Sequence, residues 1–182
     1  MAKLVSKTYG DALFELALET GKLNEFFDEV QAVKQIFEEN GELMKLLNHP
    51  KIHKEEKVSV MEQIFENRAT REMIGFLTLV VGKERHNDII DILNYFIAEV
   101  KEFKKIGVAK VTSAVALDEK QKIAIVDKLL ATTDYRTFEM EYIIDASIVG
   151  GLIIRIGDRV VDNSIKHKLE ELARDLYGIQ LA

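Results

Sequence analysis

The sequence predicts a mainly α-helical protein, in which an N-terminal bundle of six helices is followed by a small α+β domain. Three observations support this fold class. Apolar residues recur at helical spacing up to residue 105, alternating strand-like patterns appear only after that point, and an amphipathic helical pattern closes the chain. We therefore expect two domains, residues 1–105 and 106–182, with no proline-rich linker because the only proline is Pro50.

Six runs of helical spacing fill the first domain. Their apolar positions are Val5, Tyr9, Ala12, Leu13 and Leu16; Leu23, Phe26, Phe27, Val30, Val33 and Phe37; Leu43, Leu46 and Leu47; Val58, Met61, Ile64 and Phe65; Met73, Ile74, Phe76, Leu77, Leu79, Val80 and Val81; and Ile89, Leu93, Phe96, Val100 and Phe103. Asn40-Gly41 and Asn48-His49-Pro50 are stop signals, and Thr70 can cap the fifth helix. The connections are short, which predicts antiparallel neighbours in a compact bundle.

The second domain begins with a change of pattern. Residues 108–115 are rich in β-branched and small residues, and Asp118 with Gln121 predicts a capping box at the start of a helix. Residues 137–144 alternate between apolar and polar side chains, as in a strand with one buried face.

The chain then returns to a strand, a turn and a last helix. Residues 152–156 are expected to form a strand that Gly157-Asp158 turns toward Val160-Val161. Asp162-Asn163-Ser164 offers caps for the last helix. The apolar positions of that helix are Ile165, Leu169, Leu172 and Leu176.

No residue pattern indicates catalysis, and we expect no catalytic, cofactor or metal site. Pro50 interrupts the i,i+4 pair His49 and His53, and zinc needs at least three protein ligands. Asp145, Ser147 and His167 lack a nucleophile-elbow motif. The pair Gly150-Gly151 lacks the Gly-Lys-Ser/Thr of a phosphate loop and is typical of a bulge or a close backbone approach.

The composition excludes further classes of function. The formal net charge of −6 argues against nucleic-acid binding, and no cysteine is present for disulfides or thiolate chemistry. The longest apolar run, residues 148–154, is far shorter than the ~20 residues of a membrane-spanning helix. We expect no direct membrane insertion, and the plain N-terminus favours a bacterial source over an organelle.

The first and fifth helices have apolar faces that are too wide for a helix packed on one side. At 100° per residue, the apolar residues of the first cover about two-thirds of its circumference, and the fifth has almost no polar face. One explanation is a central helix enclosed by its own bundle. The other is a groove between the two helices for a partner's amphipathic helix, to which Tyr9 is suited because its hydroxyl can stay hydrated.

Three segments resemble the delta subunit family of rotary (F-type) ATP synthases, which includes the mitochondrial oligomycin-sensitivity-conferring protein. The first is Asp145-Ala-Ser-Ile-Val-Gly-Gly-Leu-Ile-Ile-Arg-Ile-Gly-Asp-Arg-Val-Val-Asp-Asn-Ser164. The others are Lys7-x-Tyr9-x-x-Ala12-x-Phe14-x-x-Ala17 and Gly75-Phe-Leu-Thr-Leu-Val-Val-Gly-Lys-Glu-Arg85. The family usually has Asn where Gly75 stands, which leaves any polar contact of that Asn in doubt.

The resemblance implies a non-catalytic stator connector, one copy per complex, that joins the catalytic head of ATP synthase to its peripheral stalk. The N-terminal helix of an alpha subunit would dock between helices one and five, against Tyr9, Ala12, Phe76 and Leu79. Helical geometry adds Val5, Met73 and Val80 as neighbours. The C-terminal end of the b subunits would bind the C-terminal third, on the cytoplasmic face of a bacterial membrane.

The resemblance also marks signature residues that are expected to shape the second domain. They are Asp145, Gly150, Gly151, Leu152, Ile154, Gly157, Asp162 and Ser164. Two alternatives stay open: a helical adaptor or chaperone-like module that binds amphipathic helices outside ATP synthase, and an enzyme.

Overall fold

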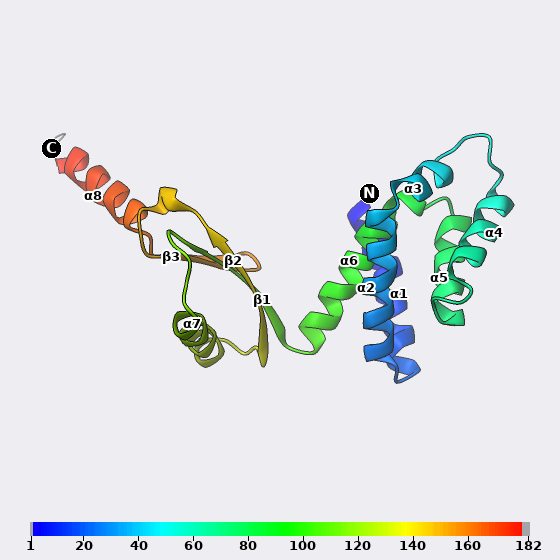
Figure 1. Cartoon of the computed structure of the whole chain (residues 1–182), viewed down its shortest axis with the longest axis horizontal. Coiled ribbons are helices and arrows are strands. Elements are labelled where there is room, and N and C mark those ends of the chain that lie inside the picture. The colour runs from blue at the N-terminus through cyan, green and yellow to red at the C-terminus, as the bar shows by residue number, and fades with distance from the viewer. Residues whose placement is uncertain (1, 180–182) are drawn as a thin grey trace. The chain divides into compact units, whose positions relative to one another are not determined.

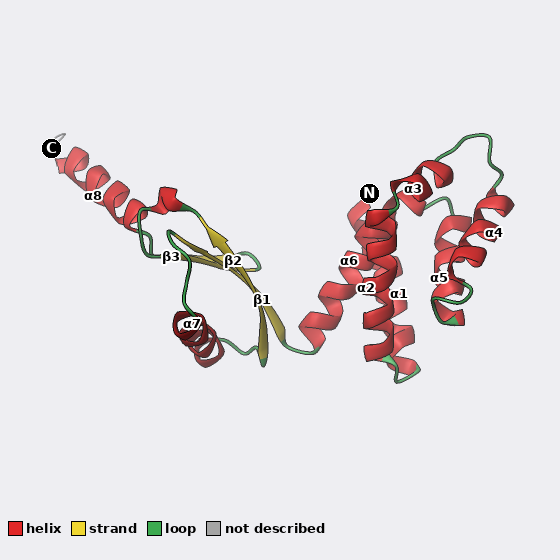
Figure 2. Cartoon of the chain, viewed as in Figure 1, coloured by secondary structure: helices red, strands yellow, loops and turns green. Residues whose placement is uncertain are grey.

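The computed structural model describes the backbone of residues 2–179 and the side chains of residues 4–174. The chain is mainly helical, with an α+β part at its C-terminal end (Figures 1 and 2). It divides into two compact units, one ending at Lys101 and the other beginning at Glu102, whereas the sequence pattern placed the boundary after Lys105.

Unit 1 consists of helices with short connections. Its elements are α1 (Ala2–Glu19), α2 (Leu23–Glu39), α3 (Gly41–Leu47), α4 (Lys54–Phe65), α5 (Arg71–Gly82), the 3₁₀ turn η1 (His86–Asp88) and α6 (Ile89–Phe103). Every α-helix of this unit contributes side chains to one hydrophobic core. The rings of Phe37 in α2 and Phe65 in α4 stack with centroids 6.1 Å apart. Phe103 was expected in the core stripe of α6 but is exposed, because the helix leaves the core after Val100.

The start of α5 is fixed to α2 by hydrogen bonds. As expected, Thr70 is the N-cap, and its Oγ1 accepts from the backbone N–H of Met73 at 3.4 Å. The backbone N–H and the hydroxyl of Thr70 both donate to the carboxylate of Glu29, each at 2.9 Å. A helix start that is bonded to a neighbouring helix has little freedom to rotate, so the outward side of α5 is held in a defined direction.

Unit 2 contains a four-stranded sheet and two α-helices. Its elements are β1 (Ile106–Ser113), α7 (Glu119–Thr132), β2 (Thr137–Ile144), the 3₁₀ turn η2 (Ala146–Ile148), β3 (Leu152–Ile156), β4 (Arg159–Asp162) and α8 (Ile165–Ile179). The strand order is β2-β1-β3-β4. The pair β1–β2 is parallel and is connected through α7, whereas β3 and β4 form an antiparallel hairpin beside β1.

The pairing register assigns the side chains to the two faces of the sheet. Ala109 lies beside Met140 on β2 and Ile156 on β3, and Val111 lies beside Tyr142 and Ile154. Ala109 and Val111 are fully buried on this face. The opposite face is polar in its middle, where Lys110 and Glu141 form an ion pair with Nζ and Oε1 3.1 Å apart.

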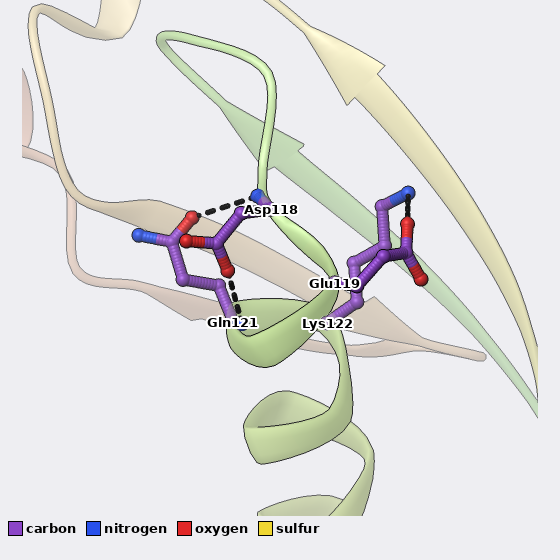
Figure 3. A network of polar contacts seen from close by, with 4 residues as sticks. All are labelled: Asp118, Glu119, Gln121 and Lys122. Carbon is purple, nitrogen blue, oxygen red and sulfur yellow. Dashed lines mark hydrogen bonds and ion pairs between the residues drawn. The ribbon is translucent and has the colours of Figure 1, made fainter.

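The predicted capping box at the start of α7 is confirmed (Figure 3). The Gln121 backbone N–H donates to Asp118 Oδ1 at 2.7 Å, and the Asp118 backbone N–H donates to Gln121 Oε1 at 3.0 Å. In the same turn Lys122 Nζ lies 2.7 Å from Glu119 Oε1 and 5.3 Å from the centroid of the Tyr142 ring. These contacts fix the entry of α7 and direct its first turn toward β2.

Candidate partner-binding surfaces

One side of α1 faces the core of unit 1, and a second apolar stripe lies beside it. The core-facing side consists of four buried residues, which are Ser6, Gly10, Leu13 and Ala17. The second stripe lies about 100° around the helix from the core-facing side. In this stripe Val5, Tyr9 and Leu16 are half-buried and Ala12 is exposed. The interior of unit 1 therefore does not use the full apolar width of α1.

Gly10 explains how close α1 lies to α6. A Cβ at position 10 would collide with the ring of Tyr95. The hydroxyl of Tyr95 donates to Asp11 Oδ1 at 2.9 Å, and burial together with this bond raises the pKa of Tyr95 to about 12. Glycine at this position lets the aromatic ring lie directly on the α1 backbone.

On α5 the expected partner-contact residues fall into two groups. Met73 and Val80 are both 0 % exposed and belong to the core, so their assignment to a partner surface is corrected: a side chain enclosed by its own unit cannot contact another protein. Phe76 is half-buried and Leu79 is 51 % exposed. Of the two helices, the residues expected to contact a partner that keep some exposure are therefore Val5, Tyr9 and Ala12 on α1 and Phe76 and Leu79 on α5.

His86 is a buried polar residue next to α3 in unit 1. Its Nε2 lies 3.3 Å from Asn48 Oδ1, and its Nδ1 has no hydrogen-bond partner within the described part of the chain. Burial lowers the pKa of His86, and the nearby positive charge of Lys57 lowers it further. The neutral ring is therefore favoured in the folded protein.

We expect unit 1 to lose stability as the pH falls through 6.5. Since the pKa of His86 is lower in the folded than in the unfolded chain, the unfolded chain binds the proton more strongly. The contribution of the neutral His86 ring to folding stability is complete above pH 6.5, the ordinary pKa of histidine. It decreases as the pH falls from 6.5 toward the lower pKa of His86 in the folded protein. Urea unfolding at a series of pH values checks this: the His86→Gln variant should lose less stability than the native chain between neutral and mildly acidic pH. Equal losses would contradict the role of His86.

The signature residues around β3 form hydrogen bonds within their own turns. Asp145 Oδ1 accepts from the Ser147 N–H and Asp162 Oδ1 from the Ser164 N–H, both at 2.9 Å. Hydrogen bonding to the side chain of each serine, and then to its backbone N–H, holds the pKa of each carboxyl below its usual value. Ser164 Oγ caps α8 by accepting from the His167 N–H at 3.1 Å. These bonds set the turns on both sides of the β3–β4 hairpin.

The paired glycines serve the close backbone approach expected of them. Gly151 has a φ of +80°, and a Cβ there would collide with the backbone oxygen of Asn163. The Asn163 N–H donates to the Leu152 oxygen at 2.9 Å, so the chain leaving β4 runs directly against β3. The remaining signature residues Leu152 and Ile154 are half-buried in the sheet, and Gly157 makes the β3–β4 turn with a φ of +54°.

An apolar cavity opens beside these glycines. It has a volume of about 530 Å³ and lies between the end of β1, the first half of α7 and the start of β3. Val149 is on its wall, 65 % exposed, with a φ of +66° that a β-branched residue rarely adopts. Such strain costs about 1–3 kcal/mol and is concentrated at functional positions. The sequence contained no signal for the conformation of Val149.

The structure also tests the residues considered for chemistry. Asp145, Ser147 and His167 line one small cavity of about 260 Å³. However, His167 Nε2 lies 3.4 Å from Glu171 Oε1, and Asp145 bonds within its own turn. Within the described residues no group of three or more His, Cys, Asp or Glu could hold a metal ion.

Membrane crossing was searched for separately. No helix in the part of the chain described here has the length and apolar character that a bilayer span needs.

These features define a protein with two compact units and exposed apolar surfaces suited to binding other proteins. The family model for the ATP synthase delta (OSCP) subunit matches residues 5–176. The ATP synthase subunit delta of Lachnoclostridium phytofermentans is 59 % identical over all of both chains, and that of Halalkalibacterium halodurans is 36 % identical over 94 % of each. The chain belongs to the ATP synthase delta (OSCP) subunit family.

A solved structure supports the fold. A chain in the mitochondrial ATP synthase hexamer of Toxoplasma gondii superposes with a TM-score of 0.74, covering 94 % of this chain and 97 % of its own length at 17 % identity. At that identity the similarity establishes the fold alone. By family membership the chain is a structural, non-catalytic subunit of ATP synthase with the role of a stator connector.

Proposed function

We propose that unit 1 binds the catalytic head of ATP synthase and that unit 2 binds the peripheral stalk. In this proposal the six helices of unit 1 act as one rigid bundle, and the N-terminal helix of an alpha subunit docks between α1 and α5. The observation that carries the proposal is a set of apolar side chains with remaining exposure, which we call the head-facing surface: Val5, Tyr9, Ala12, Phe76 and Leu79. Its side chains lie on two helices anchored in one core, yet they are left partly or largely open to solvent.

The proposed role is mechanical. When the rotor turns inside the head, the head experiences an equal torque and would turn with it unless it is tethered. A tether needs slow dissociation from both partners, and an apolar helix-in-groove contact with a buried centre supplies it. Nanomolar binding corresponds to about 12 kcal/mol. One copy per complex, held peripherally on the cytoplasmic face of the membrane through these two partners, meets the requirement.

A pull-down tests the proposal directly. The full chain, tagged and added to detergent-solubilised membranes of the source organism depleted of their own delta subunit, should recover alpha and b subunits together. A head-surface variant, Leu79→Glu, should still recover b while losing alpha. Recovery of unrelated helical proteins without alpha or b would instead favour a helical adaptor outside ATP synthase.

A further inference from the structure

The connection between α5 and α6 contains a buried histidine at the point where it meets other helices. Its 3₁₀ turn η1 lies against both α1 and α3. The first residue of η1, His86, is 8 % exposed. The Nε2 atom of His86 lies 3.3 Å from Oδ1 of Asn48, the C-cap residue of α3. The side chain of His86 therefore links the end of α3 to the connection between α5 and α6.

Asn48 determines which nitrogen of the His86 ring carries the proton. The amide nitrogen of Asn48 donates to the Met44 oxygen at 2.9 Å, so the atom that faces the ring is Oδ1, which can only accept. The proton of the neutral ring is therefore on Nε2. The other ring nitrogen, Nδ1, is buried and has no hydrogen-bond partner within the described residues. A proton on Nδ1 would create a buried N–H without an acceptor, which is costly.

The charges around His86 favour a different position for the protonated ring. Lys57 of α4 repels a positive ring, whereas Glu84 and Asp88, two residues before and after His86, attract one. The helix α3 contributes the uncharged amide of Asn48, and among the described residues no charged side chain of α1 is found to shift the pKa of His86. Protonation therefore favours movement of the ring away from α3 and α4 and toward the carboxylates of its own segment.

The same connection is bonded to the last turn of α5. The Arg85 N–H donates to the Val80 oxygen at 3.0 Å. The Lys83 N–H donates to the Leu79 oxygen, also at 3.0 Å. Between them Glu84 has a φ of +58°, a strained conformation that persists only when surrounding contacts hold it. Loss of the contact between His86 and α3 therefore affects the turn of α5 that includes Leu79.

We propose that His86 is a pH-dependent switch that controls the head-facing surface. While the ring is neutral, it holds η1 against the end of α3. When Nδ1 takes up a proton, the ring moves toward Glu84 and Asp88, the contact with Asn48 breaks, and the last turn of α5 shifts relative to α1. Acidification then weakens binding of the catalytic head. This consequence rests on the proposed function, whereas the movement of His86 follows from the geometry of unit 1 alone.

The binding test uses the full chain and a synthetic peptide of the alpha-subunit N-terminus, over the pH range in which circular dichroism shows the chain to be folded. At one pH unit below the pKa of His86, about one chain in ten keeps the neutral ring, so the affinity should be about tenfold lower than at neutral pH. His86→Gln should lose less than about twofold, because its amide can donate to Asn48 and does not titrate.

Two further variants separate His86 from other causes of pH dependence. His53→Gln removes an exposed histidine whose side chain does not cap α4, and it should show the same tenfold loss as the native chain. Lys57→Gln removes the charge that opposes protonation, so the loss of affinity should begin at a higher pH. A loss in His86→Gln as large as in the native chain would overturn control of head binding by His86.

Two measurements on the chain without peptide test the movement itself. Nitrogen chemical shifts of the His86 ring should show the Nε2–H tautomer at neutral pH. Acidification should lower the hydrogen-exchange protection of the Asn48 and Arg85 amides in the native chain but not in His86→Gln. Protection that is unchanged, or that falls equally in both chains, would overturn the switch. If the native chain failed to bind the alpha peptide even at neutral pH, the proposed function would fall, and the exchange result would still decide the movement of His86.

Discussion

Replacing Leu79 with Glu should weaken binding of the alpha-subunit N-terminal peptide by about 100-fold, or close to 3 kcal/mol, without unfolding the chain. Leu79 is 51 % exposed, so the substitution leaves the interior of unit 1 intact. In the complex, the same position would bury an unpaired carboxylate against an apolar helix, and that charge is costly to desolvate. Isothermal titration calorimetry measures the loss directly.

Leu18 offers the matched control for this experiment. It is an exposed leucine on α1, and helical geometry places it well away from the stripe of Val5, Tyr9 and Ala12. Leu18→Glu should bind the alpha peptide as the native chain does. If both variants or neither lost affinity, with circular dichroism unchanged, the assignment of the head-facing surface would be wrong.

A second large effect is expected from Gly151→Ala, which should destabilise unit 2 by about 4 kcal/mol. Two costs combine: an alanine at a φ of +80° is strained by about 1–2 kcal/mol, and its methyl group collides with the backbone of Asn163. A backbone oxygen cannot rotate away as a side chain can, so the hairpin and the following turn must separate.

Gly157→Ala separates the two costs. Gly157 also has a positive φ, +54°, but nothing lies within 4 Å of an added Cβ, so only the strain of about 1 kcal/mol should appear. Urea unfolding followed by hydrogen exchange in residues 106–162 reports on unit 2 alone. Equal losses for the two alanine variants would refute the close approach at Gly151.

The sequence was sufficient for elements whose signals are local. The caps at Thr70 and Asp118 depend on residues three positions apart, and the strand over 152–156 depends on a continuous apolar run between turn residues. The rotation of each helix about its own axis was harder to predict from the sequence. Met73 and Val80 are as apolar as Phe76, and which of them faces the core depends on where the other helices lie, which no local pattern contains.

The solvent exposure of the apolar side chains of α8 in unit 2 likewise could not be predicted from the sequence. The amphipathic pattern of α8 was visible, yet the same pattern would describe a helix folded onto its own sheet. Only the structure shows Leu169 and Leu172 open to solvent. The strained backbone of Val149 had no signal at all, because β-branched residues normally avoid that conformation.

Helix α6 and strand β1 form the covalent connection between the two units. Helix α6 contributes Ile92, Leu93 and Phe96 to the core of unit 1, and it is followed after two residues by β1, the strand that is hydrogen-bonded on both sides in the sheet. Under the proposed function, a pull transmitted through this connection enters each unit at an interior element rather than at an edge. Removing β1 from the sheet requires the ladder to β2 and the ladder to β3 to break, whereas an edge strand is held by one ladder alone.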